Sequence, residues 1–139
     1  MNFSAASREE NIRRIGEVAK MMAQAGIITV VSIISPYAKD RNKARSMMRE
    51  HASSSSSVTS RKDFIEVYLK IPISVCEERD PKGLYKKVRE GKIKGFTGVD
   101  APYEEPLNPE IVLEDGDKTP EEMARELFDY LQSNHYLSF

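Results

Sequence analysis

The 139 residues are 40% hydrophobic and carry a formal net charge of −1, which fits one compact domain with one core. No global positive field favours a nucleic-acid partner, and no apolar run is long enough to span a membrane. Cys76 is the single cysteine, which excludes an internal disulfide framework and a cysteine-based zinc site. His51 and His135 lie far apart, and we predict no metal-binding residues. Without an N-terminal signal pattern, we expect a cytoplasmic protein.

The first predicted element is a helix over residues 8–25. Ser7 to Glu10 has the form of a capping box, with Ser7 as N-cap, and Gly26 is the predicted stop. Arg8 and Asn11 lie near the helix start, where an anion can bind, although such residues more often form the solvated side. The apolar residues at helical spacing are Ile12, Ile15, Ala19 and Met22, with Val18, Met21 and Ala25 widening the stripe.

Residues 27–34, IITVVSII, are apolar without alternation and rich in β-branched side chains. This pattern predicts a strand that is covered on both faces, as in a parallel sheet. Pro36 ends strand pairing, so Ser35 is expected at the carboxyl end of the strand. Ligands of open α/β sheets bind at that edge, although many strand-to-loop turns contain Ser-Pro.

Polar and weakly patterned segments follow. Residues 40–50 predict a polar helix, and the serine-rich residues 53–60 predict a flexible surface loop. Residues 64–71 predict the next strand, and a helix is expected from Pro72, in its first turn, to about Arg79. Within that helix Cys76 is interpreted as a core residue rather than a nucleophile.

The stretch from Asp80 to Asp100 combines four glycines with the cations Lys82, Lys86, Lys87, Arg89, Lys92 and Lys94. Glycine lets a ligand approach the backbone closely, and Phe96 adds one flat apolar face. A mobile basic loop with one aromatic suits a nucleotide that carries phosphate or sulfate groups. The alternative is a solvated loop whose lysines only keep the protein soluble.

The remaining chain completes an alternating pattern. Residues 101–109 predict an irregular crossing, residues 111–113 a short strand and residues 115–117 a turn. Thr119 to Glu122 is a second capping box, followed by a helix whose inner face is Met123, Leu127, Tyr130 and Leu131. Strands that alternate with helices predict an α/β fold with a parallel sheet.

Several segments resemble the adenylyl-sulfate kinase (APS kinase) family, in the same order and over nearly the whole chain. They are Phe3-Ser4, REENIRR (8–14), GEVAK (16–20), ISPY (34–37) with Asp40-Arg41, CEERDPKGLY (76–85), IKGFTGVD (93–100) and APYE (101–104). The family is a P-loop kinase that moves the γ-phosphate of ATP to the 3′-hydroxyl of adenylyl sulfate, giving 3′-phosphoadenylyl sulfate.

The resemblance implies roles for individual residues. Phe3 and Phe96 would stack on the substrate adenine from opposite sides. Ser35 is a phosphoryl acceptor in some members and is the catalytic candidate, although in-line transfer needs only positioning and charge neutralisation. Residues implied to bind adenylyl sulfate are Phe3, Arg8, Asn11, Ile34, Ser35, Lys82 and Phe96. Residues implied to border ATP are Arg79, Gly95 and Lys118.

The resemblance also implies what residues 1–139 lack. Neither G-x-x-x-x-G-K-[ST] nor G-x-G-x-x-G occurs in them, and the family's phosphate-binding loop and first strands would precede Met1. Residues 1–139 would thus be one kinase-like domain, the C-terminal portion of the family domain, with a partial P-loop kinase-like fold. Mg²⁺ would come with ATP and be held by the missing segment. Family members are usually dimers, so a homodimer is implied.

Three functional interpretations follow. The first is an adenylyl-sulfate kinase that is inactive or weak as residues 1–139, because a P-loop holds the transferred phosphates. The second is a non-catalytic paralogue that binds adenylyl sulfate or dimerises with a full-length kinase. The third is a remnant without a ligand.

Overall fold

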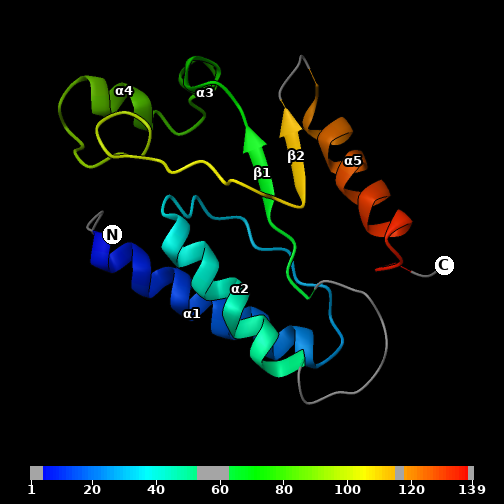
Figure 1. Ribbon diagram of the computed structural model, residues 1–139. Helices are drawn as coiled ribbons and strands as arrows, with labels where there is room; N and C mark the ends of the chain where they lie inside the picture. Colours follow the sequence, from blue (N-terminus) through cyan, green and yellow to red (C-terminus); the bar gives the residue numbers. More distant parts are fainter. Residues whose placement is uncertain (1–4, 53–62, 115–117, 138–139) are drawn as a thin grey trace. The chain divides into compact units, whose positions relative to one another are not determined.

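The computed structural model describes residues 5–52, 63–114 and 118–137 (Figure 1). The chain divides into two compact units. The helical unit comprises Met1–Ser56 and Pro81–Glu105, and the sheet unit comprises Ser57–Asp80 and Pro106–Phe139. The predicted serine-rich loop at 53–60, the turn at 115–117 and the candidate Phe3 lie outside the described residues.

In the helical unit, α1 (Ala5–Gln24) and α2 (Ala38–Ala52) pack side by side and run in the same direction (Figure 1). Ile12 is buried in this contact. Gly16 also lies in this contact, where an added Cβ would be 2.7 Å from Cε of Met47, the flexible end of that side chain. Because the two helices are parallel, the connection 25–37 must return along the length of α1 before α2 can begin.

The predicted end of α1 is confirmed and its predicted start is wrong. Gly26 has φ of +80°, and the N–H groups of Gly26 and Ile27 donate to the carbonyls of Ala23 and Met22, which is a Schellman motif. The helix already begins at Ala5, so Ser7 lies inside it and is no N-cap. The Glu10 carboxylate binds side chains of the next turn instead.

Residues 27–34 do not form the predicted strand. They have no regular secondary structure, and their apolar side chains are exposed, at 51% for Ile27, 74% for Val30 and 63% for Ile34. A strand exists only when a neighbour accepts its backbone hydrogen bonds, and none of the described residues pairs with this segment. Val18, Met21 and Met22, which belong to the apolar stripe of α1, are also exposed, because none of the described residues covers them.

The basic stretch contains a short helix, α4 (Leu84–Arg89), rather than only a loop. Gly83 precedes it with φ of +61°, and Gly91 follows it with φ of +73°. The N–H groups of Gly91 and Lys92 donate to the carbonyls of Val88 and Lys87, which closes the helix. The buried side chain of Val88 anchors α4, while its basic residues face solvent.

The sheet unit holds the two paired strands of the described residues, β1 (Val67–Lys70) and β2 (Ile111–Glu114). They are parallel, with Tyr68 opposite Val112 and Leu69 opposite Leu113. The predicted α/β class with a parallel sheet and flanking helices is confirmed, although β1 is shorter than the predicted strand 64–71. Tyr68 and Leu113 are buried, and α5 (Pro120–Ser133) packs on β2 with Met123 buried.

Local signals for the helices of this unit are mostly confirmed. Thr119 caps α5 as predicted, because its Oγ1 accepts from the Glu122 N–H at 3.2 Å and the Glu122 carboxylate accepts from the Thr119 N–H at 2.7 Å. Pro72 is the N-cap of α3 (Ile73–Arg79) rather than a residue of its first turn. Cys76 is half-buried. Among the described helices, none has the length and apolar character that a membrane span needs.

Candidate functional site

The turn at Ser35 and Pro36 is the first part of the candidate site. Pro36 is fully buried, and Ser35 is half-buried. Ser35 has a φ of +41°, a backbone angle that residues other than glycine rarely adopt. Arg41 holds this turn, because its guanidinium donates to the Ser35 carbonyl at 2.8 Å and to the Glu104 carbonyl at 2.7 Å. The same guanidinium lies 5.9 Å from the centre of the Tyr103 ring.

Glu104 completes this link between the Ser35 turn and the segment 101–104. Its carboxylate accepts the N–H of Ala38, the first residue of α2, at 2.7 Å, and its own N–H donates to the Pro36 carbonyl at 2.8 Å. A carboxylate at a helix N-terminus satisfies a free N–H group and complements the helix dipole. Sequence reasoning gave no role to Arg41 and Glu104, because the segments that they join, 35–41 and 101–104, are more than sixty residues apart in the sequence.

A second part is the loop 95–101, which is closed by its own hydrogen bonds. The carboxylate of Asp100 accepts the N–H of Gly95 at 2.7 Å and the N–H of Phe96 at 2.5 Å. The Phe96 carbonyl accepts the N–H groups of Val99, Asp100 and Ala101 at 3.0–3.1 Å. The hydrogen bonds from Gly95 and Phe96 lower the pKa of Asp100, with Arg8 adding a smaller effect.

Arg8 connects α1 to this loop. Its guanidinium donates to the Gly95 carbonyl, 87 positions along the chain. Arg8, predicted to bind substrate, and Gly95, predicted to border ATP, are therefore brought together. The contact found is to a backbone carbonyl, and it leaves a half-buried guanidinium beside the loop that carries Phe96.

Phe96 is buried rather than displayed on the surface. Only 9% of the residue is exposed, and its ring meets the ring of Tyr85 in a T-shaped contact with centres 5.0 Å apart. This contact ties the loop to α4. Sequence reasoning treated Phe96 as the single aromatic of a mobile loop and did not consider Tyr85 as its partner.

The other candidates are spread over both units. Asn11, Ile34 and Lys82 are exposed in the helical unit. Arg79, at the end of α3, and Lys118 belong to the sheet unit, where Lys118 forms an ion pair with Glu126 at 2.5 Å. Among the described residues, no group of three or more His, Cys, Asp or Glu side chains could hold a metal ion.

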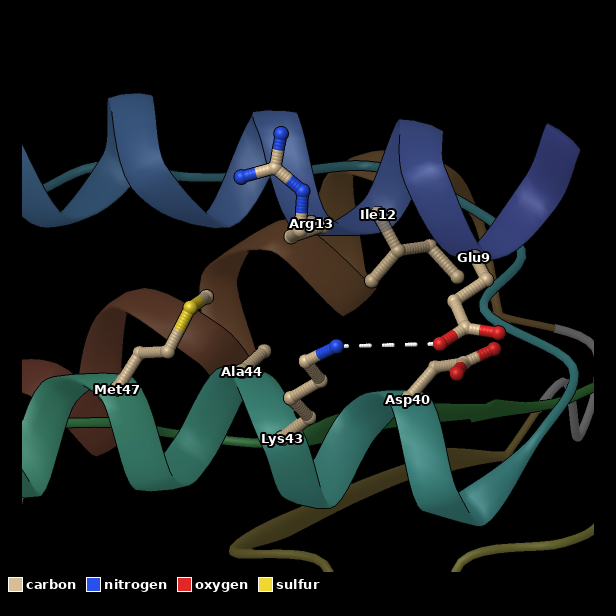
Figure 2. Close-up of a pocket in the computed structure, with 7 residues that line it drawn as sticks. All are labelled: Glu9, Ile12, Arg13, Asp40, Lys43, Ala44 and Met47. Atoms are coloured by element: carbon tan, nitrogen blue, oxygen red, sulfur yellow. Dashed lines mark ion pairs between the residues drawn. The ribbon is translucent and has the colours of Figure 1, made fainter. Parts of the chain in front are cut away.

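A small pocket lies between α1 and α2 (Figure 2). The carboxylates of Glu9 and Asp40 point toward one another at one end of it. Glu9 pairs with Lys39 at 3.3 Å and with Lys43 at 3.8 Å, and its hydrogen bond raises the pKa of Lys39. Asp40 is 3% exposed, and its Oδ2 has no hydrogen-bond partner within the described part of the chain. Sequence reasoning did not single out this pocket.

Comparison with known proteins identifies relatives. The family model described as adenylylsulphate kinase matches residues 1–114. Adenylyl-sulfate kinase 1, chloroplastic, of Arabidopsis thaliana is 53% identical over 138 residues, which cover 99% of this chain and 46% of that protein. The adenylyl-sulfate kinase of Oceanobacillus iheyensis is 47% identical over 137 residues, which cover 99% of this chain and 63% of that protein. The chain thus spans roughly half to two thirds of the length of these relatives.

A solved structure agrees with the sequence relatives. The Mycobacterium tuberculosis APS kinase CysC, in complex with AMPPNP and APS, has a TM-score of 0.84 and 41% sequence identity. The match covers 95% of this chain and 70% of that one.

Proposed function

Because the chain belongs to the adenylylsulphate kinase family, we propose that it binds adenylyl sulfate in the helical unit. The reaction proposed for the whole protein is phosphoryl transfer from ATP to the 3′-hydroxyl of adenylyl sulfate, as part of sulfate assimilation. The observation that carries this proposal is the contact of Arg8 with the Gly95 carbonyl, which places a guanidinium beside the loop of Phe96. The complex of the Mycobacterium tuberculosis relative with AMPPNP and APS supports both ligands.

Each candidate residue has a proposed task on the substrate side. The guanidinium of Arg8 and the ammonium of Lys82 neutralise the anionic groups, and Asn11 donates a hydrogen bond. Ile34 and Ser35 line the pocket at the end of segment 27–34, with Phe3 and Phe96 on either face of the adenine. Because Phe96 is 9% exposed and already contacts Tyr85, one face of its ring must be uncovered when the adenine stacks.

On the ATP side we propose Arg79, Gly95 and Lys118. Ser35 remains the catalytic candidate, and its strained backbone at φ of +41° lies in a turn that Arg41 holds in place. Mg²⁺ would enter with ATP, and the described residues offer no ligand cluster for it, so no step is assigned to them. A homodimer and a cytoplasmic location are part of the same proposal.

A second candidate function, for residues 1–139 taken by themselves, is adenylyl-sulfate binding without catalysis. The observation that favours it is the sequence itself, which contains no G-x-x-x-x-G-K-[ST] motif in residues 1–139. Backbone N–H groups and a lysine of that motif hold the β- and γ-phosphates in P-loop enzymes. We therefore expect residues 1–139 to bind adenylyl sulfate but to transfer phosphate slowly.

Calorimetric titration and a coupled ATP assay separate these interpretations. We expect saturable binding of adenylyl sulfate, and Arg8→Ala should raise the Kd by roughly ten-fold or more, because a charge-assisted hydrogen bond is lost. Arg14→Ala is the matched control, since Arg14 lies on the same helix with a side chain that is 73% exposed, and it should leave the Kd unchanged.

The titration and the assay together distinguish substrate binding from catalysis by residues 1–139. Binding with little turnover supports the expectation for residues 1–139. Rapid turnover by residues 1–139 would refute the predicted weakness, and no heat of binding at millimolar adenylyl sulfate would refute the substrate site.

A further inference from the structure

We propose that Asp100 is a positioning residue that holds Gly95 and Phe96 in one preformed turn for an adenine nucleotide. This inference rests on the proposed function, because it concerns how the loop presents Phe96 to that ligand. It adds a residue to which neither the resemblance nor the comparisons assign a task.

The first support is the way in which one carboxylate satisfies two consecutive amides. The two N–H groups of Gly95 and Phe96 point to the two oxygens of Asp100, at 2.7 and 2.5 Å. Hydrogen bonds to a charged acceptor are stronger than those between neutral groups. Gly95 has φ of +70°, so the backbone itself is bent where the carboxylate holds it.

The second support is that the opposite end of Phe96 is fixed by the same short segment. Its carbonyl accepts three N–H groups, from Val99, Asp100 and Ala101. Gly98 closes the turn, because its N–H donates to the Ala101 carbonyl at 2.8 Å. With both its N–H and its carbonyl bound, Phe96 has little backbone freedom, so the direction of its Cα–Cβ bond is set before any ligand arrives. The ring itself is held by its contact with Tyr85.

The third support is the position of the turn beside a candidate substrate residue. Arg8 donates to the carbonyl of Gly95, directly before Phe96 in the chain. This hydrogen bond thus holds the loop that carries Phe96 next to the guanidinium that is proposed to contact the anionic part of the ligand. A preformed loop loses less conformational entropy when the ligand binds. Loosening the loop should therefore weaken affinity without removing a contact to the ligand.

The test compares Asp100→Ala, Asp100→Asn and the matched control Glu105→Ala, an exposed carboxylate of the same segment. Binding of adenylyl sulfate is measured by calorimetry, and hydrogen exchange of the Gly95 and Phe96 amides is measured by NMR. We expect Asp100→Ala to raise the Kd about ten-fold and to speed exchange at those two amides. Asp100→Asn should be intermediate because its amide oxygen still accepts, and Glu105→Ala should resemble the unchanged chain.

The amides of α1 separate positioning from general destabilisation. If Asp100→Ala speeds exchange in α1 as much as in the loop, Asp100 is merely structural and the inference is wrong. Equal affinity in Asp100→Ala and the unchanged chain would also overturn it. If the unchanged chain itself does not bind adenylyl sulfate, the proposed function fails, and the ligand role of Asp100 fails with it.

Discussion

Arg41 shows how one side chain can fix a candidate catalytic turn. Its guanidinium donates to the carbonyls of Ser35 and Glu104, two residues that are far apart in the sequence. The planar fork of arginine can reach both acceptors at once, whereas a lysine ammonium is a single point. The unusual φ of Ser35 is therefore maintained by a residue of α2, six positions further along the chain.

We predict that Arg41→Lys lowers the free energy of unfolding by about 1–2 kcal/mol, because one of the two charged hydrogen bonds is lost. Urea unfolding followed by circular dichroism measures the change. Arg14→Lys is the control, and an exposed site of that kind should change stability by less than about 0.5 kcal/mol. Equal stability of Arg41→Lys and the unchanged chain would show that the fork does not hold the turn.

The carboxylate of Glu10 should make the stability of the protein depend on pH. Hydrogen bonds from Arg13 and Arg14 lower the pKa of Glu10 from 4.5 to about 2. A lowered folded-state pKa contributes stability above the unfolded value, which is lost as the pH falls from about 4.5 toward 2. The difference in thermal midpoint between the unchanged chain and Glu10→Gln should thus be full above pH 5 and vanish near pH 2. A difference that is constant over this range, or that grows in acid, would contradict the assignment.

Among the elements, the end of α1 and the start of α5 could be predicted from the sequence, whereas the start of α1 and the missing strand at residues 27–34 could not. Gly26 and Thr119 act on groups within a few residues, so their motifs are readable locally. Segment 27–34 has the composition of a buried strand, but pairing depends on a neighbour that the pattern does not contain. The task of Arg41 was missed because it joins Ser35 to Glu104, which only the fold brings together. The task of Asp100 was missed although its partners are four and five residues away, because the sequence does not show that this loop folds back on its own carboxylate.

The exposed segment 27–34 can be tested directly by adding a charge. Val30 is 74% exposed, so Val30→Lys should leave the chain folded and should lower its binding of a hydrophobic dye. Val88→Lys is the contrasting variant, because Val88 is 9% exposed and a buried lysine should unfold the helical unit. If Val30→Lys unfolds the chain as Val88→Lys does, residues 27–34 are covered, as the sequence alone predicts.

For the whole molecule, the candidate residues divide between the two units. Arg8, Asn11, Ile34, Ser35, Lys82 and Phe96, the described substrate candidates, belong to the helical unit. Two of the three ATP candidates, Arg79 and Lys118, belong to the sheet unit. The family could be identified from the sequence because its motifs run for up to ten consecutive residues, and the comparisons confirm it. We therefore expect residues 1–139 to bind the substrate through the helical unit.

The most direct test is a calorimetric titration of residues 1–139 with adenylyl sulfate, beside a titration with AMP, which lacks the sulfate group. We predict saturable binding of adenylyl sulfate, with AMP weaker because it lacks the sulfate oxygens that Arg8 and Lys82 are proposed to contact. The Arg8→Ala variant should show a smaller difference in affinity between the two nucleotides, because only Lys82 remains to contact the sulfate. Equal affinity for both nucleotides in the unchanged chain, or no binding of either at millimolar concentration, would contradict the account.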